Sequence, residues 1–248
     1  MNQTVGAYYQ CHKNAASFIR TIKSFKQFYP ESDIVIINDG GYDYQYYCNN
    51  NNIKYTYIPK TTELTQQALI FTSFTSCLLF LKNLFDSFKN IKETHILLLE
   101  DDVRVLKTNT LPFLSTINGC NKNEKLHPIL INILKEKGYN GPFFYGACGG
   151  CVIDKEFFQN IDFKDVEKLI YKIKDVPQVF ASDILISFIA LYFGGTIDQY
   201  DEFAEMWYHD IQTLILNNKI AFLHQYKQDY EKNGVFPNDD ELIELFDK

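Results

Sequence analysis

Three consecutive carboxylates, Glu100, Asp101 and Asp102, directly follow the apolar residues 95–99. Two unit charges about 4 Å apart repel by about 4 kcal/mol at an effective dielectric near 20, so folding alone does not favour this triplet. If the apolar run is a strand, its alternation places Glu100 and Asp102 on one side and Asp101 on the other. Carboxylate oxygens are the ligands that Mg²⁺ and Mn²⁺ prefer, commonly together with phosphate oxygens. The triplet therefore predicts a divalent cation site, and the alternative is a solvated acidic turn.

The cysteines offer a second possible chemistry. Only Cys148 and Cys151 form a CxxC pattern, and a zinc site would normally require a second ligand pair at close spacing. We therefore favour packing of small residues over metal or redox use for this pair. The six cysteines are scattered through apolar segments, which suggests reduced thiols in a cytosol-like compartment.

Composition and charge exclude several classes of partner. The chain has 248 residues, of which 46% are hydrophobic and 22% are charged, as in ordinary globular proteins. Its net charge of −7 disfavours a nucleic-acid partner, which usually requires a basic face. The most apolar run, residues 68–81, is interrupted by hydroxyl residues and is too short for a bilayer, and no signal peptide is recognisable. We expect a cytoplasmic protein without a membrane span.

Strands and helices alternate along the first half of the chain. Residues 4–10, 33–38, 53–58 and 95–99 have the apolar pattern of strands. Helices are predicted after a cap at Asn14 and over residues 66–88. This order predicts an α/β fold with a mainly parallel sheet covered on both faces, in which ligands bind at the carboxyl ends of the strands.

The second half has a weaker pattern. Residues 143–154 predict two short strands, or a strand and a glycine-rich turn, and residues 179–193 predict an apolar helix. Residues 220–224 read as a last short strand. Asn238 and Glu241 form a plausible capping box for an acidic C-terminal helix.

Four sequence motifs follow one another in the first half of the chain. They are CHKN (11–14) before a predicted helix, SFKQFYP (24–30), DIVIINDGG (33–41) and LLLEDDV (97–103). This combination resembles the nucleotide-sugar half of glycosyltransferases with the GT-A fold. The resemblance covers roughly residues 5–104 well and the remainder in outline. It implies a single Rossmann-like domain over residues 1–230, with a nucleotide-sugar-binding half (1–106) and an acceptor-side half (107–230). Residues 231–248 would form an acidic helix or tail.

The resemblance also implies an activity. Such enzymes move a sugar from a nucleotide-sugar donor to an acceptor hydroxyl with the help of Mn²⁺ or Mg²⁺. For this chain we favour a UDP-sugar as donor, with a GDP- or TDP-sugar as alternatives. A glycan, a protein or a small molecule could be the acceptor.

Five residues of the first half match donor-site positions of the family. Asp102 matches the residue that contacts the metal directly, while Glu100 and Asp101 match residues near the ribose and the donor sugar. Asp39 matches the acidic residue that contacts the nucleoside, and Gln10 lies in the matching turn after the first strand. Asp39 has an equally plausible structural role, since Asp-Gly-Gly is also a good turn.

Two residues near the end of the predicted domain resemble further family positions. His224 resembles the histidine that serves as a metal ligand, and Lys227 resembles the basic residue that faces the diphosphate. A lone histidine is more often structural, so that role stays open for His224. His12 and His209 are weaker candidates for the same function.

Asp183 resembles the carboxylate base of inverting members, which lies at the start of a helix below the acceptor site. Burial beside an apolar helix can raise the pKa of such a carboxyl toward a useful value, and the reaction would then be a single displacement. Asp183 could instead cap its helix. Asp201 and Glu205 are competitors for the role of base.

Glycines and aromatic residues permit two interpretations each. Gly149 and Gly150, with Gly146, could let the backbone approach the donor sugar or could relieve crowding between strands. Aromatic residues beyond the last predicted helix could stack on sugar rings or belong to the core; they are Tyr200, Phe203, Trp207 and Tyr208.

Two other functions compete with glycosyl transfer. A sugar-phosphate nucleotidyltransferase would need a glycine-rich phosphate loop after the first strand, and residues 7–17 contain no glycine. A carbohydrate- or protein-binding module could keep the fold without turnover, although the intact acidic triplet argues against it.

Overall fold

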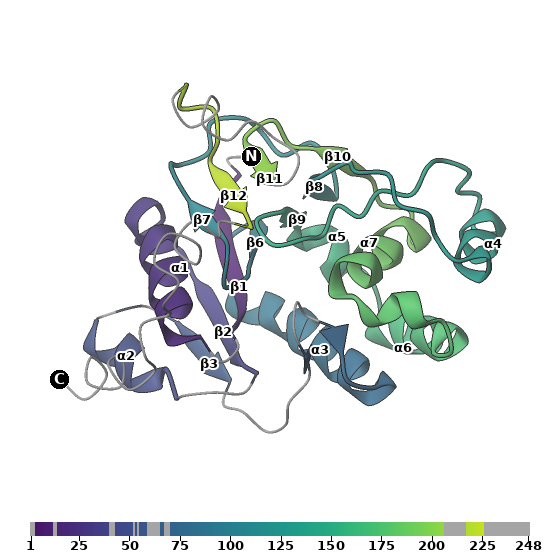
Figure 1. Cartoon of the computed structure of the whole chain (residues 1–248), viewed down its shortest axis with the longest axis horizontal. Helices are drawn as coiled ribbons and strands as arrows, with labels where there is room; N and C mark the ends of the chain where they lie inside the picture. Colours follow the sequence, from purple (N-terminus) through teal and green to yellow (C-terminus); the bar gives the residue numbers. More distant parts are fainter. Residues whose placement is uncertain are drawn as a thin grey trace, which may run out of the picture.

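A seven-stranded sheet runs through the centre of the molecule, with the strand order β10-β8-β9-β6-β1-β2-β3 (Figure 1). The computed structural model describes residues 3–11, 14–39, 43–51, 53, 55–58, 65–66, 70–205 and 217–225. Only β9 is antiparallel to its neighbours, so the predicted mainly parallel sheet is confirmed. The strands are β1 (Val5–Cys11), β2 (Ile34–Asn38), β3 (Thr56–Ile58), β6 (His95–Leu99), β8 (Ile117–Gly119), β9 (Val152–Asp154) and β10 (Ile197–Gln199).

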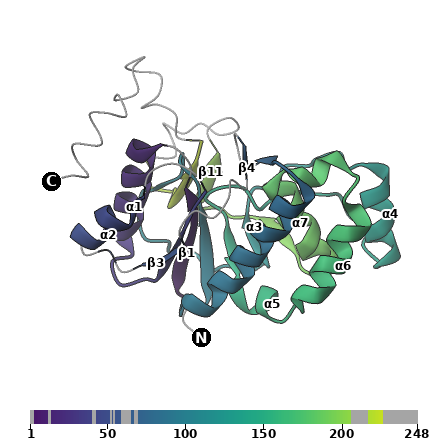
Figure 2. The ribbon, with the colours of Figure 1, turned by 90° about the horizontal axis from the view of Figure 1, so that it is seen from below.

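Helices cover both faces of this sheet (Figure 2). Successive side chains of β1 point to opposite faces of the sheet and so belong to two separate hydrophobic cores. Tyr8 lies in one core, while Ala7 and Tyr9 lie in the other. The core around Tyr9 is closed by α1 (Ala15–Phe28) and α2 (Gln45–Asn50). The core around Tyr8 is closed by α3 (Phe74–Ser87), α4 (Pro128–Glu136), α5 (Lys155–Gln159), α6 (Phe163–Ile173) and α7 (Ser182–Tyr192).

A small second sheet packs against the α1 side. It has the order β11-β12-β7, with bounds Phe203–Glu205, Phe222–His224 and Arg104–Val105. The strands β11 and β12 are parallel and pair Glu205 with His224, whereas β12 and β7 are antiparallel and pair Leu223 with Arg104. This sheet therefore brings β11 and β12, which are distant in the chain, beside β7 and the turn that follows β6.

The predicted helix over residues 66–88 is wrong in its first third. The chain instead forms the short antiparallel strands β4 (Thr65–Gln66) and β5 (Ile70–Phe71). The helix α3 begins only at Phe74, because the extended residue Ser73 accepts a hydrogen bond from the backbone N–H of Ser76 and so acts as the N-cap. Short apolar runs do not distinguish strand from helix by periodicity, which explains the error.

Other expected elements are shifted at their ends. The helix predicted over residues 179–193 is α7, preceded by a separate 3-10 turn, η3 (Pro177–Phe180); a second such turn, η2 (Phe88–Asn90), follows α3. The segment 143–154 contains one strand, β9, after a glycine-rich turn. The expected C-terminal helix, with Asn238 and Glu241, lies outside the described residues. Within the described part of the chain, no helix combines the length and the apolar character that spanning a membrane requires.

Candidate functional site

The acidic triplet lies in a turn that connects β6 to β7. The backbone N–H of Val103 donates to the carbonyl of Glu100 at 3.1 Å, which closes the turn. The buried guanidinium of Arg104 donates to Thr21 Oγ1 at 3.0 Å and so ties the turn to α1. A turn, and not the strand alternation expected from the sequence, therefore positions these carboxylates.

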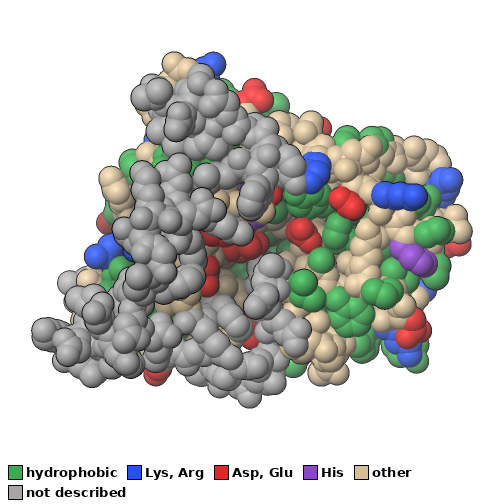
Figure 3. Space-filling view, viewed as in Figure 1, with side chains coloured by type: hydrophobic (Ala, Val, Ile, Leu, Met, Phe, Trp, Pro, Cys, Tyr) green, Lys and Arg blue, Asp and Glu red, His purple; other side chains and the backbone are tan. Residues whose placement is uncertain are grey.

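His224 at the end of β12 faces two of the three carboxylates. Its Nε2 is 3.6 Å from Oε2 of Glu100 and 3.6 Å from Oδ1 of Asp102. The antiparallel pairing of Leu223 with Arg104 favours this neighbourhood, since His224 directly follows Leu223 and the acidic turn directly precedes β7. Figure 3 shows acidic side chains gathered near the middle of this face of the molecule.

The residues present fit a divalent cation. One donor atom from each of Glu100, Asp102 and His224 lies within 4.8 Å of the others, and two carboxylates with an imidazole suit Mn²⁺ or Mg²⁺. Burial alone lowers the pKa of His224, but the neighbouring side chains of Cys148, Glu100 and Glu205 outweigh burial and raise this pKa well above its usual value. The metal-free site thus favours a positive imidazolium, and a cation would replace that proton.

Asp101 turns away from this group. The hydroxyl of Tyr9, a fully buried β1 residue, donates to Asp101 Oδ1 at 2.6 Å. This contact fixes the carboxylate on the side of the α1 core. Glu100 and Asp102 therefore share one point in space while Asp101 lies beside them.

Gln10 and Asp39 meet at the carboxyl ends of β1 and β2. Gln10 Nε2 donates to Asp39 Oδ2 at 2.8 Å, and both residues are buried. The hydroxyl of Tyr8 donates to Gln10 Oε1 at 3.3 Å. The two residues matched to the nucleoside end thus form a connected pair, while Gly40 and Gly41 of the predicted turn lie outside the described residues.

Asp183 occupies the first turn of α7. The N-cap position is Ala181, so the alternative that Asp183 caps the helix is wrong, although its Oδ1 accepts from the N–H of Ile184 at 2.7 Å. Burial raises the pKa of Asp183 to about 6; the Ile184 hydrogen bond opposes this change and the charge on Glu100 adds to it. Asp183 also lines an open groove of about 430 Å³, together with Lys122 and Tyr145.

Other candidates divide into three groups. Asp201 is exposed, whereas Glu205 is only 1% exposed and lies with its Oε1 3.6 Å from Nδ1 of His224. Tyr200 and Phe203 are buried in the α1-side core and cannot stack on a sugar. Several candidates lie outside the described residues, namely His12, Lys227, Trp207, Tyr208 and His209.

The glycine-rich turn before β9 completes the site. A Cβ on Gly149 would lie 2.9 Å from Cδ of Glu100, so only glycine lets the turn approach this carboxylate. Gly150 has φ +82° and donates its N–H to the carbonyl of Leu98 at 2.7 Å. The turn also places the thiol of Cys148 beside His224 and Glu205, a contact that nothing in the sequence spacing indicates.

Comparison with known proteins identifies the fold. Neither a protein-family model nor a curated protein sequence matches this chain. A solved structure of galactosyltransferase LgtC in complex with donor and acceptor sugar analogues aligns with a TM-score of 0.51 and 12% identity, over 98% of this chain and 95% of that chain. An active-site mutant of LgtC aligns over the same shares with a TM-score of 0.53 and 13% identity. The chain therefore has the GT-A fold that the sequence motifs predicted.

Proposed function

We propose that this chain is a metal-dependent glycosyltransferase that moves a sugar from a nucleotide-sugar donor to an acceptor hydroxyl. The observation that carries the proposal is the convergence of Glu100, Asp102 and His224 on a GT-A fold. This convergence lies at the carboxyl end of β6, the side of an α/β sheet on which ligands bind.

The donor side uses residues of β1, β2 and the acidic turn. Glu100, Asp102 and His224 would hold a divalent ion, which in such a site offsets the negative charge on the departing diphosphate. Asp101, oriented by Tyr9, would lie beside the ribose and donor sugar. The buried pair of Gln10 and Asp39 would lie at the nucleoside, and Lys227 would face the diphosphate.

The acceptor side uses Asp183. A carboxyl with a pKa of about 6 is mostly ionised at pH 7, and it can accept the proton of an acceptor hydroxyl that enters the groove beside Lys122 and Tyr145. Direct attack by that hydroxyl would invert the anomeric carbon. Determination of the product anomer by NMR tests this role, since retained configuration would exclude Asp183 as the base of a single displacement.

The donor and acceptor classes are inferred from the fold. LgtC was solved with donor and acceptor sugar analogues, and a chain that aligns with it over nearly its whole length is expected to take ligands of the same two classes. We favour a UDP-sugar over a GDP- or TDP-sugar. The acceptor would be a glycan, a protein or a small molecule with a free hydroxyl.

A pair of melting experiments tests the metal site. Asp102→Asn keeps the shape of the side chain. It removes repulsion from Glu100 and Asp101 but also removes the ion pair with the His224 imidazolium, so the stability of the apo protein should stay close to that of wild type. Mn²⁺ with the best-binding sugar nucleotide at 100 times its dissociation constant should stabilise wild type by about 2.7 kcal/mol and the variant far less. The exposed Asp201→Asn serves as the matched control and should keep the full ligand effect.

Two outcomes would contradict the proposal. Equal ligand-induced shifts in wild type and Asp102→Asn would exclude the cation site. Donor binding without donor hydrolysis or transfer, across a panel of acceptors, would instead identify a binding module on the same fold.

A further inference from the structure

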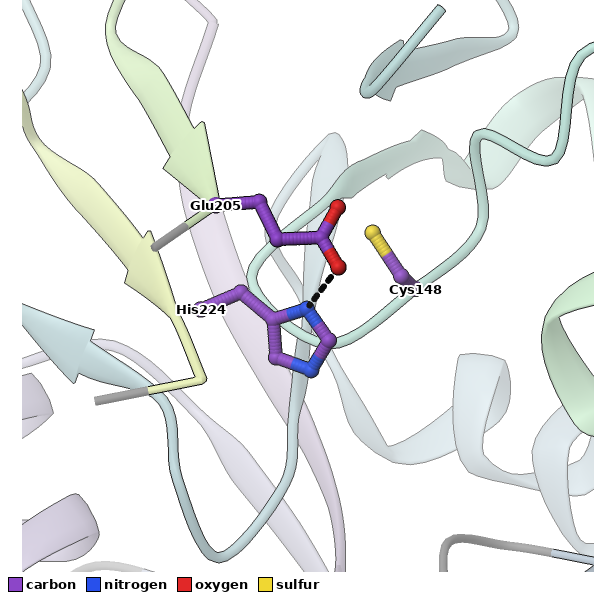
Figure 4. A group of neighbouring side chains, drawn as sticks. All are labelled: Cys148, Glu205 and His224. Atoms are coloured by element: carbon purple, nitrogen blue, oxygen red, sulfur yellow. Dashed lines mark ion pairs between the residues drawn. The ribbon is translucent and has the colours of Figure 1, made fainter. Parts of the chain in front are cut away.

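The imidazole of His224 has a second group of neighbours, on the side away from Glu100 and Asp102. One donor atom from each of Cys148, Glu205 and His224 lies within 4.8 Å of the others (Figure 4). The three residues come from the glycine-rich turn before β9, from β11 and from β12. Their exposed fractions are 3%, 1% and 6%, so all three are buried.

The geometry leaves one ring nitrogen of His224 available to a ligand. Nδ1 is buried and makes no hydrogen bond within the part of the chain that the structure describes. Its nearest carboxylate oxygen, Oε1 of Glu205, is 3.6 Å away; this contact is an ion pair when the imidazole is protonated, but it is too long for a hydrogen bond (Figure 4). A buried polar atom without a hydrogen bond is unfavourable, and a cation bound between these side chains would give the neutral ring nitrogen a direct ligand bond.

The ligand atoms of this group differ from those of the acidic turn, because one of them is a sulfur. A cysteine sulfur is a soft ligand, and a combination of thiolate, imidazole and carboxylate suits Zn²⁺ better than Mn²⁺ or Mg²⁺. Burial raises the pKa of the Cys120 thiol, and the nearby charge of Glu205 adds to this change, which places a further sulfur near the group. The side chains of Glu100 and Asp102, which contact the same imidazole, are 23% and 19% exposed.

We propose that Cys148, Glu205 and His224 form a second cation site, which takes a thiophilic divalent ion such as Zn²⁺. Binding displaces the thiol proton of Cys148 and the Nδ1 proton of the His224 imidazolium to solvent, and it forms one metal–sulfur and one metal–nitrogen bond. Because one imidazole ring serves this site and the Glu100–Asp102 site, two dications would repel each other across it. Occupation of the sulfur site therefore weakens occupation of the acidic site, and Zn²⁺ acts as an antagonist of Mn²⁺.

Cobalt substitution tests the sulfur ligand without any assay of transfer. Addition of Co²⁺ to the reduced wild-type chain should produce a near-ultraviolet charge-transfer band from thiolate to cobalt, and Zn²⁺ should abolish it by competition. Cys148→Ser should lose the band and bind Zn²⁺ more than about 10-fold less tightly. Cys151→Ser is the matched control, because this buried cysteine of the same turn is not part of the group, and it should keep the band.

A measurement on the wild-type chain gives an answer even if the Cys148→Ser variant does not fold. X-ray absorption at the zinc edge of the one-to-one complex should show sulfur at about 2.3 Å together with nitrogen or oxygen ligands. A first shell without sulfur, or a cobalt band that survives Cys148→Ser, would overturn the proposal. An unchanged Mn²⁺ affinity in the zinc complex would overturn the linkage between the two sites. The cation site proposed here rests on the same His224 as the proposed function, but none of these measurements depends on glycosyl transfer. A chain without transferase activity could therefore still be shown to bind Zn²⁺ through Cys148, and the reverse.

Discussion

The ionised carboxylate of Asp183 lowers the stability of the folded chain at neutral pH, although it is the proposed base of the reaction. Its pKa is raised from 3.8 to about 6 in the folded chain, so the folded state binds the proton more tightly than the unfolded state. The stabilisation is full below pH 3.8 and is lost as the pH rises through 6. Asp183→Asn, which is never charged, should therefore increase the free energy of unfolding at pH 7.5 by up to about 3 kcal/mol.

Urea unfolding at pH 7.5 and pH 3.5 measures this effect, which should be present at the first pH and absent at the second. The exposed Asp175→Asn should show no gain at either pH. The same Asp183→Asn chain should lose turnover by about 10² or more and keep its nucleotide affinity, since only proton removal from the acceptor is lost. Unchanged stability at pH 7.5 would mean that the folded chain does not raise the pKa of Asp183, and near-normal turnover would remove it from the mechanism.

At the scale of elements, the glycine-rich turn before β9 should tolerate little change. Gly150→Ala would introduce a side chain at φ +82°, with its Cβ 3.1 Å from the ring of Phe203. A left-handed backbone alone costs about 1–2 kcal/mol for a residue other than glycine, and contact with a packed aromatic ring adds to this cost. We expect Gly150→Ala to be destabilised by more than 2 kcal/mol.

Gly138→Ala provides the matched control, because this residue has φ +86° and no atom within 4 Å of the added Cβ. The difference between the two variants in urea unfolding isolates the contact with Phe203. Equal losses in both variants would show that backbone conformation alone explains the effect.

The elements themselves were predictable where burial is continuous. The strands β1, β2 and β6 are buried along their whole length and are mostly apolar, and their sequence pattern located them to within a residue or two. The helix predicted over residues 66–88 begins too early compared with α3, because residues 70–71 pair as a strand before the N-cap at Ser73. The hydroxyl of Ser73 caps the helix and so sets that boundary, which the spacing of apolar residues does not indicate.

The candidate site was predictable only in its local part. Glu100, Asp101 and Asp102 are adjacent in the sequence, and the family resemblance added His224. Cys148 and Glu205 join them only through the turn before β9 and the register that pairs Glu205 with His224. Spacing along the chain does not indicate that register, so the sequence alone does not reveal the further ligands that a zinc site needs.

At the scale of the whole molecule, one buried carboxylate joins the loop after β7 to the segment before β11. Glu202 is 3% exposed; it accepts from Lys107 Nζ at 2.5 Å and from the N–H groups of Thr110 and Leu111 at 2.7 and 2.9 Å. Burial alone would raise the pKa of Glu202, but these donors outweigh burial and lower it to about 2. The resulting stability is present above pH 4.5 and is lost as the pH falls toward 2.

Glu202→Gln should therefore lower the free energy of unfolding at pH 7 by about 3 kcal/mol, and this deficit should shrink below pH 4.5. Guanidinium unfolding at a series of pH values measures it, with the exposed Glu156→Gln as a control that should match wild type throughout. A deficit that does not change with pH would indicate lost packing and not a lost charge.

The pairing of β12 with β7 has a kinetic consequence. It joins Leu223 to Arg104, residues far apart in the chain, and contacts across such separations form late because loop closure must come first. We therefore expect His224 to reach Glu100 and Asp102 only after most of the central sheet has formed. Interactions that are absent from the folding transition state change the unfolding rate and leave the folding rate almost unaltered. A cation bound between these residues is expected to lengthen the lifetime of the native state without making the chain fold faster.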